Sequence, residues 1–161
     1  MKEIYLAGGC FWGVEEYFSR IKGVESTKVG YANSNTDSPS YQLVCTGSTN
    51  AAETLHLIYD ESVIELEGIL EYYFRIIDPV SINKQGHDVG TQYRTGVYYT
   101  NDEDADIIKR YCEKVQGNYT QKLAVEIMPL ENFFDAEEYH QRYLKKNPNG
   151  YCHIDLSKAE E

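Results

Sequence analysis

The apolar residues of this chain change their spacing repeatedly, and this limits the folds that it can adopt. Ile4 and Leu6 alternate with polar or small neighbours, which predicts a strand. Val14, Phe18 and Ile21 then recur at helical spacing. A strand, a turn and a helix are therefore expected at the start of the chain.

The same patterns predict the remaining elements. Strands are expected over 24–33, 53–60, 94–100 and 122–128, and helices over 66–77, from a cap at Asn101 or Asp102, and over 135–146. The resulting order, β-α-β-β-α-β-α-β, predicts an α+β fold. We expect a two-layer sandwich with a mixed sheet and a ferredoxin-like split βαβ core.

Composition excludes several classes of partner. The chain has 161 residues, and 15 basic against 26 acidic residues give a net charge of −11. Such a charge opposes binding to nucleic acid and to anionic membranes. The N-terminus lacks the apolar core of a signal peptide, and no apolar run approaches the roughly 20 residues that span a bilayer. We expect one catalytic domain over 1–161 in the cytoplasm.

Cys10 stands in "GGCFWG", where the first strand gives way to the first helix. The unpaired N–H groups and positive dipole of a helix N-terminus favour a thiolate. Phe11 and Trp12 could wall a small apolar pocket beside this sulfur. A buried structural cysteine is the alternative interpretation. A phosphate-binding loop would need an arginine soon after Cys10, and none stands there. A thioredoxin-like pair would need a second cysteine at position 13, which is Gly13. Neither class of site is therefore expected.

The other cysteines differ in context. Cys112 lies on the apolar stripe of a helix and is expected in the core, and Cys45 has no evident partner. Cys152 stands in a tail, about 147–161, that contains Pro and Gly, so its thiol is expected to be mobile and accessible. The histidines and cysteines lack metal-site spacing, and we expect a sulfur mechanism with no metal or other cofactor.

Four separated motifs, "GCFWG", "PSYQLVCTG" with a following Glu, "QGHDVGTQYR" and "FFDAEEYHQRY" with "NPNGYC", occur in the order typical of one family. In them the chain resembles the A-class peptide methionine sulfoxide reductases over nearly its whole length. The resemblance implies Cys10 as the nucleophile, Phe11 and Trp12 as the pocket for the substrate methyl group, and Glu53 as the acid. It also implies a polar surround of Tyr41, Asp88 and Tyr93, and Cys152 as the resolving thiol.

The resemblance implies reduction of methionine-S-sulfoxide, free or in proteins, as a repair of oxidative damage. The Cys10 sulfenic acid would condense with Cys152, and thioredoxin or a similar dithiol would reduce the disulfide. A protonated Glu53, its pKa raised by burial, would assist the leaving oxygen.

The chain departs from the family at Asn50-Ala51, where Gly-His is usual. It also ends soon after Cys152, so a single recycling thiol is expected. Two rival classes stay open. A cysteine hydrolase or acyl transferase would need a histidine base near Cys10, and no histidine can be placed there from the sequence. A peptide-binding module that uses its tyrosines would show no turnover.

Overall fold

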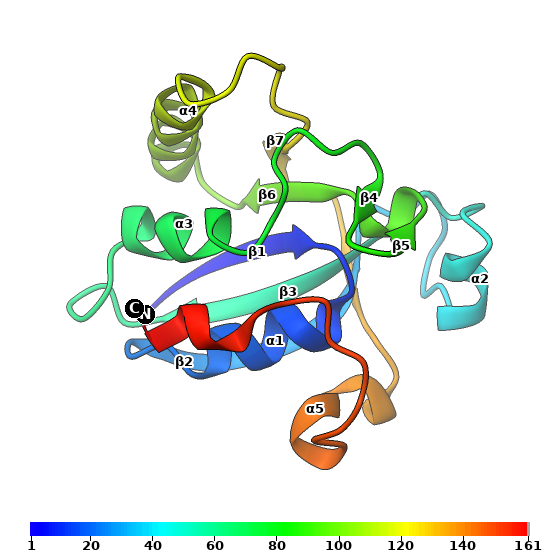
Figure 1. Ribbon diagram of the computed structural model, residues 1–161. Helices are drawn as coiled ribbons and strands as arrows, with labels where there is room; N and C mark the ends of the chain where they lie inside the picture. The colour runs from blue at the N-terminus through cyan, green and yellow to red at the C-terminus, as the bar shows by residue number, and fades with distance from the viewer. Residues whose placement is uncertain (161) are drawn as a thin grey trace.

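A mixed six-stranded sheet organises the protein (Figure 1). The computed structural model describes residues 1–160. The strands are β1 (Lys2–Gly8), β2 (Val24–Ala32), β3 (Ala52–Tyr59), β6 (Thr95–Tyr99), β7 (Glu126–Pro129) and β8 (Phe133–Asp135). They lie in the order β7-β6-β1-β3-β2-β8. The predicted α+β class with a mixed sheet is confirmed.

Strand β3 lies between β1 and β2 and runs antiparallel to both, so β1 and β2 are parallel. Helix α1 (Phe11–Ser19) connects them. Helix α3 (Leu66–Phe74) lies on the connection from β3 to β6, which pairs antiparallel with β1. Strand β7 adds parallel to β6, and β8 adds antiparallel to β2. The antiparallel pairing of β2 with β3 sets Tyr31 opposite Glu53.

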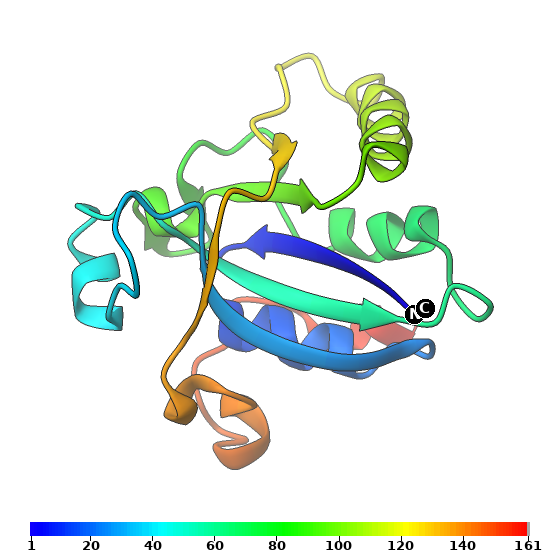
Figure 2. The same ribbon diagram turned by 180° about the vertical axis from the view of Figure 1, so that it is seen from behind.

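The two faces of the sheet are covered differently. Helices α1 and α3 pack on one face, where Phe18 and Ile69 join strand residues such as Leu55 in the main core (Figure 1). The chain between β7 and β8 crosses the other face, and Figure 2 shows it running over the strands. A smaller apolar cluster that includes Tyr5 and Tyr98 lies on that side.

Helix α4 (Asp102–Gln116) packs beside α3 and near β6 and β7. It begins as predicted, because the Asn101 side chain accepts a 2.9 Å hydrogen bond from the Asp104 backbone N–H. Smaller elements escaped the sequence patterns. They are helix α2 (Tyr41–Cys45), the short strands β4 (Lys84–Gln85), β5 (Asp88–Val89) and β8, and the 3-10 turns η1 (Thr91–Tyr93) and η3 (Leu156–Glu160).

The single helix predicted over 135–146 is wrong. The structure has a 3-10 turn, η2 (Glu138–His140), and a short helix α5 (Tyr143–Lys146). Between them Arg142 adopts a left-handed conformation with φ 52°. The Gln141 side chain hydrogen-bonds the backbone N–H and C=O of Val29 in β2 at 2.9 and 2.8 Å. This tertiary contact interrupts the helix.

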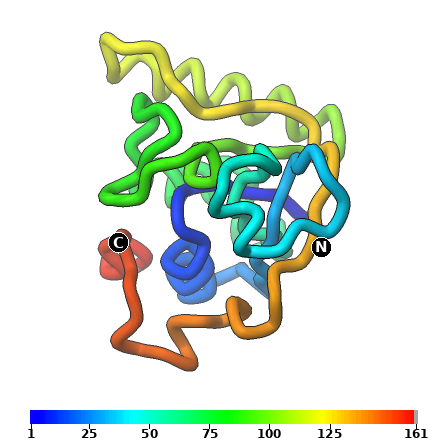
Figure 3. The backbone as a smooth tube through the Cα atoms, turned by 90° about the vertical axis from the view of Figure 1, so that its right-hand side faces the viewer, coloured from blue at the N-terminus to red at the C-terminus, as the bar shows by residue number. Residues whose placement is uncertain are grey.

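The C-terminal segment passes below α1 and ends beside it, as Figure 3 shows. Ile154 and Ala159 are buried in the main core. The segment over 147–160 therefore has a docked position, and its mobility stays a prediction. Among residues 1–160, no helix is both long and apolar enough to cross a bilayer.

Candidate active site

Cys10 caps the N-terminus of α1 and is only 7% exposed. The turn that leads to it needs Gly9, whose φ of 89° lies in the left-handed region. Burial, and then the charge of Glu53, raise the pKa of Cys10, whereas a hydrogen bond from the Trp12 backbone N–H lowers it. Burial thus opposes the effect of the helix N-terminus, on which the expected thiolate rests.

Glu53 lies in β3 and is 1% exposed. Its Oε1 accepts a 3.1 Å hydrogen bond from the Phe11 backbone N–H, which ties it to the residue after Cys10. Its Oε2 has no hydrogen-bond partner within residues 1–160. Burial, opposed by the hydrogen bond from the Phe11 N–H and aided by the charge of Asp88, raises the pKa of Glu53 to about 8. Glu53 is therefore a neutral acid near pH 7, as burial was expected to make it.

The predicted polar surround gathers around this acid. Burial and then the charge of Glu53 raise the pKa of Tyr41 and of Tyr93, so both hydroxyls remain protonated. Asp88 contributes to the raised pKa of Tyr93 and accepts a 2.9 Å hydrogen bond from the Tyr151 hydroxyl. The structure thus brings the predicted polar residues together, and their roles stay predictions.

A second carboxylate, Glu137, holds this surround in place. Its Oε1 accepts a 2.8 Å hydrogen bond from the Tyr31 hydroxyl, and its Oε2 accepts a 3.0 Å bond from the Tyr41 backbone N–H. Tyr31 in β2 pairs with Glu53 in the neighbouring strand β3, and it is fully buried. Glu137 therefore bridges Tyr31, the neighbour of Glu53 in the sheet, and the backbone of Tyr41 at the start of α2, and so holds α2 near the acid. Glu137 was not among the expected site residues, although it stands in the motif "FFDAEEYHQRY", because its partners lie 106 and 96 positions away in the sequence.

An aromatic wall stands next to Cys10. The indole N–H of Trp12 donates a 2.9 Å hydrogen bond to Nδ1 of His140, and the indole stacks on Tyr143 with ring centroids 3.8 Å apart. The rings of Phe11 and Tyr41 lie 5.3 and 4.5 Å from that of His140. Phe11 and Trp12 therefore belong to one aromatic cluster with His140, and their role as a pocket for the substrate methyl group stays a prediction.

His140 is a site residue that the sequence reasoning missed. It is 1% exposed, and burial lowers its pKa, so the ring is neutral. Within the described chain its Nε2 has no hydrogen-bond partner. The contact with Trp12 spans 128 residues, so the signal for His140 was its place in the motif "FFDAEEYHQRY" rather than any periodic pattern.

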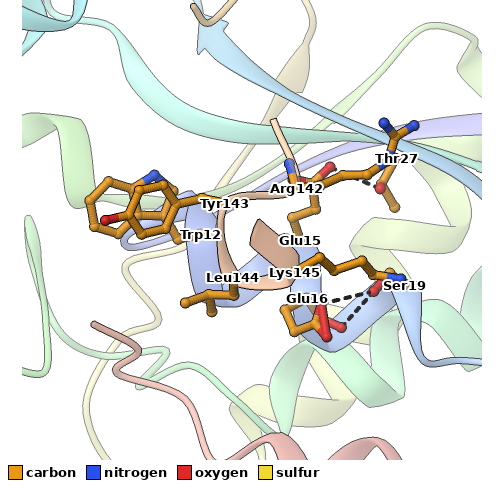
Figure 4. A pocket seen from close by; sticks show the side chains of 9 residues that line it. All are labelled: Trp12, Glu15, Glu16, Ser19, Thr27, Arg142, Tyr143, Leu144 and Lys145. Carbon is orange, nitrogen blue, oxygen red and sulfur yellow. Dashed lines mark hydrogen bonds between the residues drawn. The ribbon is translucent and has the colours of Figure 1, made fainter. Parts of the chain in front are cut away.

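A small cavity of about 40 Å³ lies between α1 and α5, on a side of Trp12 that does not include Cys10. Its lining is Trp12, Glu15, Glu16, Ser19, Thr27, Arg142, Tyr143, Leu144 and Lys145 (Figure 4). A space of this size admits water rather than a side chain. Beside it Glu15 accepts hydrogen bonds from the Arg142 N–H and the Thr27 hydroxyl at 2.7 and 2.9 Å, which holds α5 against α1.

The other thiols lie in distinct environments. Cys152 is half-buried, and its Sγ would lie 2.9 Å from a Cβ on Gly13, one helical turn after Cys10. Cys112 is buried in the core, as predicted. Cys45 is exposed at the end of α2 and hydrogen-bonds Tyr41. In the described part of the chain, no group of three or more His, Cys, Asp and Glu side chains could hold a metal ion.

The departure at Asn50-Ala51 has a local explanation. Asn50 has φ 54°, a left-handed conformation that glycine adopts freely and that asparagine tolerates. Ala51 is buried in the main core just before β3. The loop therefore delivers Glu53 to the site with Asn50 in the conformation that a glycine would take.

Comparison with known proteins identifies one family. The family model described as peptide methionine sulfoxide reductase matches residues 2–161. The peptide methionine sulfoxide reductase MsrA of Clostridium perfringens is 57% identical over 156 residues, which cover 97% of this chain and 99% of the relative.

Solved structures agree with the fold. Mxr1 from Saccharomyces cerevisiae in reduced form has a TM-score of 0.91 at 44% identity, covering 96% of this chain and 91% of Mxr1. The same protein in complex with Trx2 has a TM-score of 0.64 at 30% identity, covering 88% of this chain and 84% of that one.

Proposed function

Because the chain belongs to the peptide methionine sulfoxide reductase family, we propose that it reduces methionine-S-sulfoxide through Cys10, with Glu53 as the acid. The chain is an oxidoreductase of this family. The observation that carries the assignment is the pairing of a buried thiol with a neutral carboxyl whose Oε2 has no hydrogen-bond partner among residues 1–160. The Phe11 N–H links the two residues.

The first step needs no net proton. The Cys10 sulfur attacks the sulfoxide sulfur and forms a transient S–S bond. The oxygen then moves to the Cys10 sulfur: the S–O bond of the substrate and the S–S bond break, and an S–O bond forms on Cys10. Methionine sulfur gains the two electrons that the Cys10 sulfur loses. Glu53 donates its proton to the sulfoxide oxygen, and the thiol proton restores the acid. This exchange avoids a lasting charge in a buried site, where an anion is costly.

Tyr41 and Tyr93 keep their protons and can donate hydrogen bonds to the sulfoxide oxygen. Phe11 and Trp12 would receive the methyl group. Asp88 would complete the polar surround and, through Tyr151, connect it to the tail.

Recycling uses the tail thiol. The Cys10 sulfenic acid and the Cys152 thiol condense to a disulfide and release water, and a dithiol then reduces the disulfide. The Mxr1 complex with Trx2 supports thioredoxin as that dithiol. A flexible tail over about 147–161 would let the disulfide reach it. Repeated reduction needs a reducing compartment, so we place the enzyme in the cytoplasm.

The strand order β6-β1-β3-β2, with α1 and α3 as the connections, supports a ferredoxin-like split βαβ core in a two-layer sandwich. This arrangement would hold Cys10, at the end of β1, beside Glu53, at the start of the neighbouring β3.

The test is a sulfoxide assay. The protein is incubated with dithiothreitol and methyl p-tolyl sulfoxide, and the sulfide is measured. We expect turnover in the parent protein and none in Cys10→Ser, whose fold is checked by circular dichroism. Sulfide formation by Cys10→Ser would reject Cys10, and no sulfide from the parent protein would favour a hydrolase or a peptide-binding module.

A further inference from the structure

His153, the residue after Cys152, is held against the backbone that leads to Cys10. Its Nε2 lies 3.0 Å from the carbonyl oxygen of Gly8. A carbonyl oxygen only accepts, so Nε2 carries the proton and donates it to this bond. Within residues 1–160, the other ring nitrogen, Nδ1, is buried with no hydrogen-bond partner. The bond to Gly8 is thus the one polar contact that the ring makes in this part of the chain.

Two glycines, one on each side of Cys10 in the sequence, leave the space in which this tail segment packs. A Cβ on Gly9 would lie 2.9 Å from His153 Nε2, and a Cβ on Gly13 would lie 2.9 Å from Cys152 Sγ. Both distances are shorter than real Cβ contacts allow. The side chains of Cys152 and His153 therefore occupy space that any other residue at 9 or 13 would fill.

The neighbouring contacts leave the thiol itself weakly held. Cys152 Sγ donates a long hydrogen bond, 3.4 Å, to the Ile154 carbonyl oxygen. The Tyr151 hydroxyl binds Asp88, on the exposed side of the segment. Ile154 is buried in the core after the thiol. Between Tyr151 and Ile154, the His153 bond is a polar contact that joins the tail to the turn before Cys10.

We propose that His153 is a positioning residue for the second half-reaction, and that its Nε2–H bond to the Gly8 carbonyl holds Cys152 beside Cys10. The inference rests on the proposed resolving role of Cys152. In that half-reaction an S–S bond forms between the two cysteines, the S–O bond of the Cys10 sulfenic acid breaks, and the Cys152 proton leaves with the hydroxyl as water. His153 neither gains nor loses a proton in this step.

The test compares three variants that differ in where they hold a donor. His153→Gln can place an amide N–H near the position of Nε2, whereas the shorter side chain of His153→Asn cannot reach the Gly8 carbonyl. His153→Ala removes the donor. Full-length protein reacts with one equivalent of methyl p-tolyl sulfoxide without reductant. Sulfide release reports the first step, and thiol titration in quenched samples reports disulfide formation.

We expect His153→Ala and His153→Asn to release one equivalent of sulfide at the parent rate but to form the disulfide about 3- to 10-fold more slowly, as loss of one hydrogen bond predicts. A dimedone adduct on Cys10 should accumulate in both. His153→Gln should recover most of the parent rate. This rescue distinguishes an anchoring bond from general packing.

Unchanged disulfide formation in His153→Ala, or a rate in His153→Gln as low as in His153→Ala, would overturn the inference. Loss of sulfide release in all three variants would also overturn it, because His153 would then support the Cys10 turn itself. Cys152→Ser is measured alongside. If Cys152→Ser loses the disulfide while the His153 variants keep the parent rate, the proposed function stands and only the inference about His153 fails.

Discussion

The Cys152 sulfur lies directly over Gly13, so closely that a Cβ on Gly13 would stand 2.9 Å from Sγ. Gly13 belongs to the first turn of the helix that Cys10 caps. Without substrate, Cys152 therefore already lies against the first turn of α1, the helix that begins at the proposed nucleophile. The absence of a side chain at position 13 is what permits this approach.

Gly13→Ala should slow the formation of the Cys10–Cys152 disulfide without unfolding the protein. Alanine favours a helix over glycine by about 1 kcal/mol, which offsets part of the roughly 1–3 kcal/mol that overpacking against the tail costs, so the melting temperature should change little. The added methyl displaces Cys152, and disulfide formation after one turnover should slow about tenfold. Stopped-flow thiol titration measures that rate. The matched control is Gly117→Ala, at the end of α4, which should leave it unchanged. Equal rates in Gly13→Ala and the parent would show that the docked thiol is not the reacting one.

The pH dependence of the first step should follow Glu53. Its pKa is raised to about 8, so the acid form that donates the proton is lost as the pH rises through about 8. Single-turnover sulfide release should therefore be level below that pH and fall above it. In Glu53→Gln the rate should drop about 10²- to 10⁴-fold, with little change in KM, and the inflection should vanish. An inflection that persists in Glu53→Gln would assign the proton to another group.

Stability should report the same ionisation without substrate. The pKa of Glu53 rises from 4.5 to about 8 on folding, so the folded state binds more protons between these values. The resulting stability is present at low pH and is lost as the pH rises from about 4.5 to about 8. Glu53→Gln lacks this loss and keeps the acceptor for the Phe11 N–H. The melting temperature of Glu53→Gln minus that of the parent should increase across this window, by roughly 2–4 °C per kcal/mol. A constant difference would contradict the raised pKa.

Trp12→Phe should test the aromatic wall. Phenylalanine can keep the stack on Tyr143 but cannot donate to His140 Nδ1, which would leave both nitrogens of a buried ring without a protein partner. We expect a loss of about 1–3 kcal/mol in the free energy of unfolding and a higher KM for the sulfoxide. Tyr143→Phe, which retains the stacked ring, is the control. An unchanged KM in Trp12→Phe would remove the indole N–H from substrate binding.

Much of the fold was predictable because its central elements have strong periodic patterns. Strands β1, β2, β3 and β6 and helices α1, α3 and α4 carry apolar residues at the spacings that their structures require. The helix predicted over 135–146 failed because Gln141 binds the backbone of β2, more than a hundred residues away. Short elements such as α2 and β5 are too brief to show a period.

In the candidate site, too, some residues could be predicted from the sequence, whereas others depend on contacts between distant segments. The position of Cys10 at a helix start could be inferred from local sequence, and the resemblance supplied Glu53 and its tyrosines. Glu137 and His140 stand in the motif "FFDAEEYHQRY" but were not singled out, because their contacts are with distant Tyr31 and Trp12. The expected thiolate at Cys10 rested on the helix terminus, a local feature, whereas the burial that raises its pKa depends on the whole fold.

The most direct test of the account is peptide mapping after one turnover without reductant. The account predicts one equivalent of methionine from methionine-S-sulfoxide, the loss of two thiols, and a disulfide that joins Cys10 to Cys152, with Cys45 and Cys112 still reduced. Cys152→Ser should release the same methionine but lose turnover with thioredoxin. A disulfide from Cys10 to Cys45 or Cys112, or full thioredoxin-supported turnover in Cys152→Ser, would contradict it.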